Sequence, residues 1–160
     1  GWSGANRYLL AQIRERLDMP KTVSTLRNFH AKITAQYQRA VHATLVEDAA
    51  NGAAVLATLR SRIPGLKAVT AQGSKEARAA AISPTVEAGN VFLPEGAAWV
   101  EDFIGECASF PNAAHDDQVD ALSQAVNWIN VVQPASFGGT VPDNSAPNIW
   151  KFEGAEDEEE

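Results

Sequence analysis

Segments of strand character alternate with segments of helical character along this 160-residue chain, and this alternation restricts the possible fold most. The clearest helix is predicted over 20–37, where apolar residues recur at helical spacing. These residues are Val23, Leu26, Phe29, Ile33 and Tyr37. Further helices are predicted over 53–62, 75–82 and 97–109, and an acidic helix should end near 132. Strands are predicted over 8–13, 41–46 and 66–71, with a brief extended piece at 90–94. The order predicts an α/β fold with some parallel strand pairing.

Both ends of the chain differ in composition from the middle. Residues 1–6 have the composition of a turn that normally joins two strands. We therefore expect the first half of a hairpin to be missing and the chain to be a fragment. At the other end, 133–160 is rich in proline, glycine and acids and predicts a flexible acidic tail. Residues 1–132 are then expected to form a single domain.

The net charge of −7 is concentrated in the tail. Residues 151–160 hold six acids and one lysine, and Asp143 adds a further negative charge, so residues 1–132 carry only −1. Five cations lie close together in the sequence between Arg60 and Arg78, interrupted by one acid, Glu76. DNA binding by the body of the chain is therefore compatible with its charge.

Several protein classes are disfavoured by what the sequence lacks. No apolar run is long enough for a membrane span, and no leader has the pattern of a signal peptide. Cys107 is the only cysteine, which excludes an internal disulfide and a cysteine-based metal site. No glycine-rich loop for ATP phosphates follows a strand. A reducing cytosolic location fits these features.

Three aspartates lie within five residues at the start of the acidic helix: Asp116, Asp117 and Asp120. On a helix, Asp117 and Asp120 share one polar face with Gln124 and Asn127. Like charges on one face repel by about 0.2–0.5 kcal/mol when exposed. Taken alone, the acids could simply complement the positive end of the helix dipole.

Glu47 changes this interpretation because it ends a strand that should be central and buried. Carboxylates at such positions are uncommon unless they are paired or bind metal. Three or four carboxylates converging without a nearby lysine or arginine would need divalent cations. Oxygen ligands of this kind suit Mg²⁺ or Mn²⁺, and a pair of such ions can cleave a phosphodiester.

Five short blocks, taken in order, resemble the C-terminal nuclease domain of the large terminase subunit of tailed phages and prophages. They are VEDAANG at 46–52, GSKEAR at 73–78, EAGNVFLP at 87–94, FP at 110–111 and HDDQVDA at 115–121. The resemblance extends from about Tyr8 to Trp128. It implies a ribonuclease H-like fold, a mixed sheet flanked by helices that here lacks its first strand. It also implies metal-dependent cutting of concatemeric double-stranded viral DNA during genome packaging in the host cytoplasm, with the portal protein and the small terminase subunit as partners.

The resemblance also implies roles for particular acids. The family's strand-end acid falls on Glu47, and its closing helix acids fall on Asp117 and Asp120; these three would be catalytic and bind two Mg²⁺ or Mn²⁺ ions. The family's first aspartate would lie upstream of Gly1, so this chain is expected to bind metal weakly and to be poorly active.

Other polar residues near these acids are assigned supporting roles. Asp48 could orient the site, Asp116 is expected to cap the acidic helix, and His115 is expected to flank that cap. Lys75 and Arg78 follow a Gly-Ser turn that opens a helix, so they could bind a DNA phosphate. They could equally belong to a solvated helix face.

Two alternatives to this nuclease remain open. One is a non-catalytic packaging module that docks on the portal or the small subunit through the acidic tail. The other is a resolvase-like nuclease of the same fold, which would prefer branched DNA.

Overall fold

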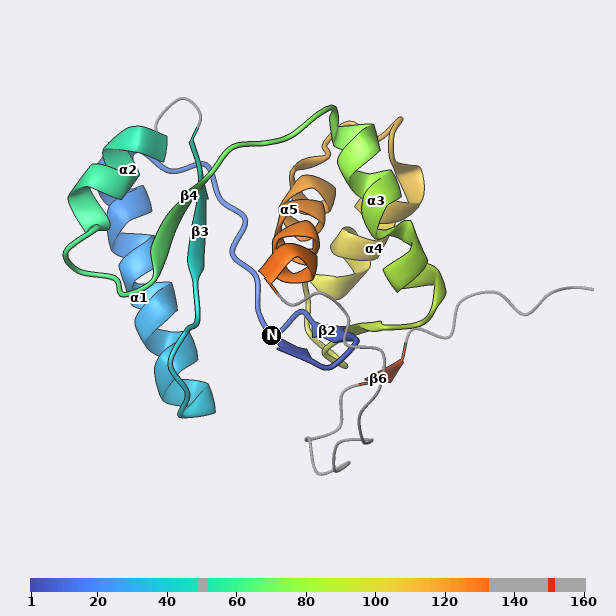
Figure 1. Cartoon of the computed structure of the whole chain (residues 1–160), viewed down its shortest axis with the longest axis horizontal. Helices are drawn as coiled ribbons and strands as arrows, with labels where there is room; N and C mark the ends of the chain where they lie inside the picture. Colours follow the sequence, from blue (N-terminus) through green and yellow to red (C-terminus); the bar gives the residue numbers. More distant parts are fainter. Residues whose placement is uncertain (49–51, 133–149, 152–160) are drawn as a thin grey trace, which may run out of the picture. The chain divides into compact units, whose positions relative to one another are not determined.

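The computed structural model describes residues 1–48, 52–132 and 150–151, which belong to two compact units. Unit 1 consists of Gly1–Ile13 and Gly73–Glu160, and unit 2 consists of Arg14–Gln72. Both units combine helices with short strands, which confirms the predicted α/β class (Figure 1). The single domain predicted over 1–132 stays a prediction. In the described residues, no helix is long and apolar enough to cross a membrane.

Unit 2 is a small helix-and-strand layer with its own core. Helix α1 (Met19–Tyr37) starts at Asp18, whose side chain accepts a hydrogen bond from the backbone N–H of Lys21. Strands β3 (Thr44–Glu47) and β4 (Leu66–Val69) pair in parallel and are connected through α2 (Gly52–Leu59). The core consists of Val55, Leu59 and Ile63, with Met19, Val23, Leu26, Val46 and Leu66 packed against it. Val23 and Leu26 of the predicted helical pattern therefore lie on the face that α1 packs, half-buried, against this core.

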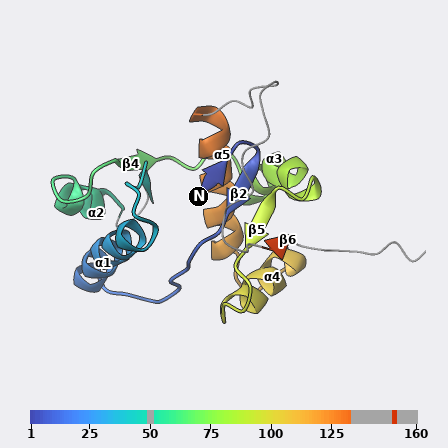
Figure 2. The same cartoon turned by 90° about the horizontal axis from the view of Figure 1, so that it is seen from below.

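Unit 1 is built on a sheet with the strand order β1-β2-β5-β6. Strand β1 (Trp2–Ser3) is antiparallel to β2 (Asn6–Tyr8), β2 is parallel to β5 (Val91–Leu93), and β5 is antiparallel to β6 (Trp150–Lys151). The helices of this unit are α3 (Lys75–Glu87), α4 (Val100–Ser109) and α5 (Asp117–Val132). Figure 2 shows α5 beside α3 and the β2–β5 pair.

Two contacts hold α5 on the first hairpin. The rings of Trp2 and Trp128 meet edge to face at 6.4 Å, and the Arg7 guanidinium donates to the Asn130 side-chain oxygen at 2.9 Å. Arg7 is itself buried, so its charge is held by hydrogen bonds instead of water. The end of α5 is thus fixed by residues from the start of the chain.

The first strand differs from the sequence prediction. Strand β2 ends at Tyr8, and its last ladder bond runs from the Leu9 N–H to the Phe92 carbonyl at 2.9 Å. Pairing stops there because Pro94, two residues beyond Phe92, has no N–H for the next ladder bond. Residues 2–3 pair with residues 6–7 across a turn in which Gly4 adopts a φ of +55°, so a short part of the hairpin's first half lies in this chain. The expectation that the chain is a fragment stays a prediction.

Helix α3 runs through the proline that was expected to stop it. Pro84 lies inside α3, which continues to Glu87. A proline in a helix interior removes one backbone hydrogen bond and costs about 3 kcal/mol. The packing of α3 against α5, in which Ile82 is buried, offsets that cost. Tertiary contacts have overridden a local helix-stop signal.

Most of the predicted acidic tail, 133–149 and 152–160, lies outside the described residues. The two described residues pair with β5, with Lys151 opposite Phe92 and Trp150 opposite Leu93. The tail therefore includes a short strand that the sequence did not predict.

Replacement of Leu59 by alanine tests the core of unit 2. Leu59 is fully buried, so Leu59→Ala should lower the free energy of unfolding by about 2–5 kcal/mol. Thr58→Ala is the control, because Thr58 is exposed on the same helix and should change stability by less than about 0.5 kcal/mol. Urea unfolding followed by circular dichroism measures both, and equal losses would contradict the assigned core.

Candidate active site at the start of helix α5

The predicted acids lie at the start of α5, but their surroundings differ. Asp117 is the first residue of α5 and is exposed to solvent. Asp120 is only 9% exposed, although it lies on the face of the helix predicted to be polar. The cause is α3, which packs along this face, so that Asn127 also donates a hydrogen bond to the Arg78 carbonyl at 3.2 Å. The polar stripe of α5 is therefore mainly an interface between helices.

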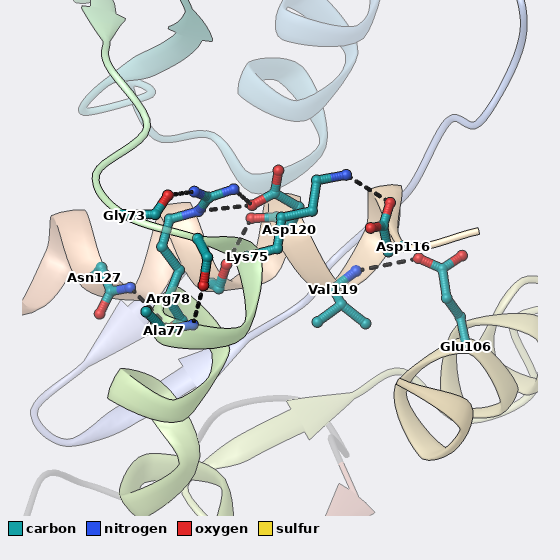
Figure 3. A network of polar contacts seen from close by, with 11 residues as sticks. Gly73, Lys75, Ala77, Arg78, Glu106, Asp116, Val119, Asp120 and Asn127 are labelled. Atoms are coloured by element: carbon teal, nitrogen blue, oxygen red, sulfur yellow. Dashed lines mark hydrogen bonds and ion pairs between the residues drawn. The ribbon is translucent and has the colours of Figure 1, made fainter. Parts of the chain in front are cut away.

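Two cations at the start of α3 bind two of these acids, as Figure 3 shows. Ser74 caps α3 as predicted, accepting the Ala77 N–H, and so places Lys75 and Arg78 in the first turn. Lys75 Nζ lies 2.6 Å from Asp116 Oδ1. Arg78 Nε and Nη2 lie 2.9 and 2.5 Å from Asp120 Oδ1. The premise that no lysine or arginine lies near the acids is therefore wrong for Asp116 and Asp120.

The Arg78–Asp120 pair is buried, with side chains that are 9% and 11% exposed. The remaining Arg78 nitrogen, Nη1, donates to the Gly73 carbonyl at 2.8 Å. All three guanidinium nitrogens are thus bound within the protein. A DNA phosphate would have to displace partners in a buried site to reach Arg78, and the DNA contact suggested for Arg78 stays a prediction.

The Lys75–Asp116 pair is more open, with side chains that are 38% and 37% exposed. The hydrogen bond to Asp116 raises the pKa of Lys75, and the charges of Asp116, Asp120 and Asp117 also raise it. Lys75 therefore stays a cation at neutral pH. Because it is partly exposed, contact between Lys75 and DNA stays a reasonable prediction.

Glu106 on α4 is a buried acid that the sequence reading missed. Its Oε1 accepts hydrogen bonds from the backbone N–H groups of Gln118 at 2.6 Å and Val119 at 3.3 Å, and its Oε2 accepts the Gln118 side chain at 2.6 Å. These backbone groups are among the first N–H donors of α5, which have no partner within the helix. A signal was present, because Glu106 follows Phe103 by three residues on the face of α4 predicted to be core.

Asp116 lies at the capping position, but its side chain does not supply the cap. Its carbonyl accepts the Asp120 N–H at 3.0 Å, as expected for the residue before a helix. Its carboxylate instead binds Lys75, while Glu106 takes the N–H groups that a capping side chain would bind. His115, predicted to flank the cap, is exposed.

Glu47 and Asp48 lie in unit 2. Both are exposed, and β3, which Glu47 ends, pairs with β4 in a two-stranded sheet of the described residues. The prediction of a central, buried strand was therefore wrong. Gly52, the first residue of α2, lies close to the end of β3, where a Cβ atom would lie 1.9 Å from the Glu47 carbonyl oxygen. Gly52 thus allows the start of α2 to approach the strand end that carries Glu47.

The carboxylates named above differ in how well they could bind a divalent cation. Asp117 and Glu47 are exposed carboxylates, and the two Arg78 donors on Asp120 both bind Oδ1 and leave Oδ2 out of the pair. Asp116 is engaged by Lys75, and Glu106 is engaged by α5. Among the residues with described positions, no three His, Cys, Asp or Glu side chains are grouped to hold a metal ion. Asp117 and Asp120 Oδ2 are thus the α5 donors compatible with a cation.

Glu106→Gln tests the cap on α5. The amide has a single oxygen, so it can replace only one of the two acceptor oxygens of Glu106, and it has no charge near the helix dipole. We therefore expect a loss of about 1–3 kcal/mol in unfolding free energy. Glu101→Gln on the same helix is the control, since Glu101 is exposed and its charge is worth at most about 1 kcal/mol. Thermal and urea denaturation should show a larger loss of stability for Glu106→Gln than for Glu101→Gln. A larger loss for Glu101→Gln would disprove the capping role.

Gly52→Ala tests the close approach beside Glu47. The new methyl group would overlap the Glu47 backbone, so β3 or α2 must shift, at a cost of about 1–3 kcal/mol. Gly105→Ala is the matched control, because no atom lies within 4 Å of a Cβ there, and alanine should stabilise α4 by about 0.5–1 kcal/mol. Urea unfolding should show that Gly52→Ala lowers the free energy of unfolding and that Gly105→Ala raises it. If both changes raise it, the close approach of Gly52 to Glu47 is refuted.

Comparison with known proteins identifies the family. Residues 6–128 match the family described as the terminase RNaseH-like domain. No curated protein and no solved structure matches the chain significantly. The matched range contains the acids of the candidate site and covers most of the chain, so the chain belongs to the terminase RNaseH-like domain family.

Proposed function

We propose that this chain is part of a metal-dependent DNA endonuclease, the nuclease domain of a terminase large subunit from a phage or prophage. Membership of the family supports a nuclease-type role in DNA packaging. The substrate would be concatemeric double-stranded viral DNA in the bacterial cytosol, and the portal protein and small terminase subunit would be partners. The observation that carries the proposal is the pair Asp117 and Asp120, of which one is exposed and the other is fixed through a single oxygen.

In this proposal Asp117 and Asp120 bind Mg²⁺ or Mn²⁺, with Glu47 as the strand-end ligand. When bound, a pair of such ions activates a water and stabilises the leaving oxygen of a phosphodiester. Asp117 contributes an exposed carboxylate, and Asp120 contributes Oδ2, the oxygen that Arg78 leaves unbound. Asp48 follows Glu47 directly and would support the strand end, since its N–H is fixed on the Val69 carbonyl at 2.8 Å.

Lys75 would guide DNA toward these acids. It is partly exposed at the start of α3, where backbone N–H groups and a cation both favour a phosphate. Movement of Lys75 from Asp116 to a phosphate would retain its charge pairing. His115, exposed just before α5, is available to contact substrate or water.

One observation favours a different role, a non-catalytic packaging module. Lys75 and Arg78 neutralise two of the three acids at the start of α5, which is the arrangement expected when acids only join helices. In that case the acids would maintain the fold, and the chain would act by docking on other packaging proteins.

Asp117→Asn separates the two roles. Asp117 is exposed, so the change should leave folding intact, whereas Asp120→Asn would also leave the buried Arg78 charge without its partner. In the protein that contains this chain, we expect Asp117→Asn to reduce Mn²⁺- or Mg²⁺-dependent nicking of supercoiled plasmid by at least about 100-fold. This size is typical for loss of an interaction that stabilises the transition state.

Asp102→Asn is the control for this test, because Asp102 is an exposed acid on α4 outside the proposed site. It should nick plasmid at the wild-type rate, and chelation of the metal should stop nicking by both proteins. Unchanged nicking by Asp117→Asn would exclude Asp117 as a ligand and favour the packaging module.

A further inference from the structure

The buried Arg78–Asp120 pair has an unusual asymmetry. Two guanidinium donors, Nε and Nη2, converge on one carboxylate oxygen, Oδ1. An arginine that serves only as a charge partner commonly binds both oxygens of a carboxylate, one nitrogen to each. Here Oδ2 receives neither donor, and Figure 3 shows the guanidinium directed at one side of the carboxylate. The pair therefore holds Asp120 by one oxygen only.

Arg78 is itself fixed at both ends. Its Nη1 donates to the Gly73 carbonyl in the turn before α3, and its backbone carbonyl accepts a hydrogen bond from Asn127, two helical turns along α5 from Asp120. Gly73 has a φ of +70°, a conformation that favours glycine, so the turn that supplies this carbonyl depends on that residue. Rotation of the Asp120 side chain would thus break both guanidinium bonds to Oδ1, because Arg78 is held in place and cannot follow it.

Asp120 is also fixed through its backbone. Its N–H donates to Asp116, and its carbonyl accepts the hydroxyl of the fully buried Ser123 at 2.9 Å. Side chain and backbone are therefore both held, while Asp117, one helical turn before it, stays exposed. This contrast is unexpected for two acids that merely complement a helix dipole.

We propose that Arg78 is a positioning residue, which holds Asp120 by Oδ1 so that Oδ2 is oriented toward a divalent cation shared with Asp117. This inference rests on the proposed function and adds a residue to it. Arginine suits the task because its fork delivers two bonds in a fixed plane, whereas lysine supplies the same charge without that geometry. Partners that orient metal ligands typically change metal affinity by 10- to 100-fold when they are lost.

Arg78→Lys tests the proposal, with Mn²⁺ binding measured by isothermal titration calorimetry and by electron paramagnetic resonance of free Mn²⁺. The lysine retains the charge in the buried site, so the protein should fold, but it cannot reproduce both bonds to Oδ1. We expect the Kd for Mn²⁺ to rise by about 10- to 100-fold. Arg27→Lys is the matched control, since Arg27 is exposed on α1, and its Kd should equal that of the wild type.

If Arg78→Lys fails to fold, the double variant Arg78→Met with Asp120→Asn removes both buried charges together and is expected to fold. The double variant retains Asp117 but lacks the carboxylate that Arg78 holds, and its net charge equals that of the wild type. Its Kd for Mn²⁺ should therefore exceed that of the wild type by at least about 10-fold. A double variant that binds Mn²⁺ as tightly as the wild type would overturn the proposal.

The outcomes separate this inference from the proposed function. If the wild type binds Mn²⁺ in a manner abolished by Asp117→Asn, and Arg78→Lys binds equally well, only the positioning role is overturned. If the wild type shows no binding that depends on Asp117, the proposed metal site is overturned, and the positioning role with it. A raised Kd for Arg78→Lys, with an unchanged Kd for Arg27→Lys, supports both.

Discussion

The structure of unit 1 depends on how the start of α5 is held. The first residues of this helix present acidic side chains and unpaired N–H groups in the same place, which would attract water or cations if left alone. Glu106 from α4 binds the N–H groups, while Lys75 and Arg78 from α3 bind two of the carboxylates. Three helices are therefore joined at one point through charge, and Asp117 is exposed there without taking part in these ion pairs.

This arrangement explains why acids of one short motif play different parts. Asp116 and Asp120 are used to join α5 to α3, and their charges are compensated by cations of the same protein. A buried carboxylate is expensive without such compensation, so Asp120 needs Arg78 whatever else it does. Under the proposed function, the cation would be bound by the exposed Asp117 and by Oδ2 of Asp120, the oxygen that Arg78 does not bind.

The order and type of the main elements could be predicted from the sequence because they depend on local patterns. Helical spacing of apolar residues located α1, and the Gly73-Ser74 turn gave the start of α3 to the residue. The errors occurred where tertiary contacts decided the outcome: β2 ends because Pro94 cannot extend the ladder, and α3 continues past Pro84 because it packs on α5.

The amino-acid sequence by itself determined the family, the α/β class and the clustering of acids on one face of a helix. Only the tertiary structure decided what each acid meets, because the partners are far apart in the sequence. Lys75 and Asp116 are separated by 41 positions and Arg78 and Asp120 by 42, a distance at which residue spacing carries no information about contact. The packing of α3 on α5 brings these charges together, and so decides which of the acids are bound within the protein.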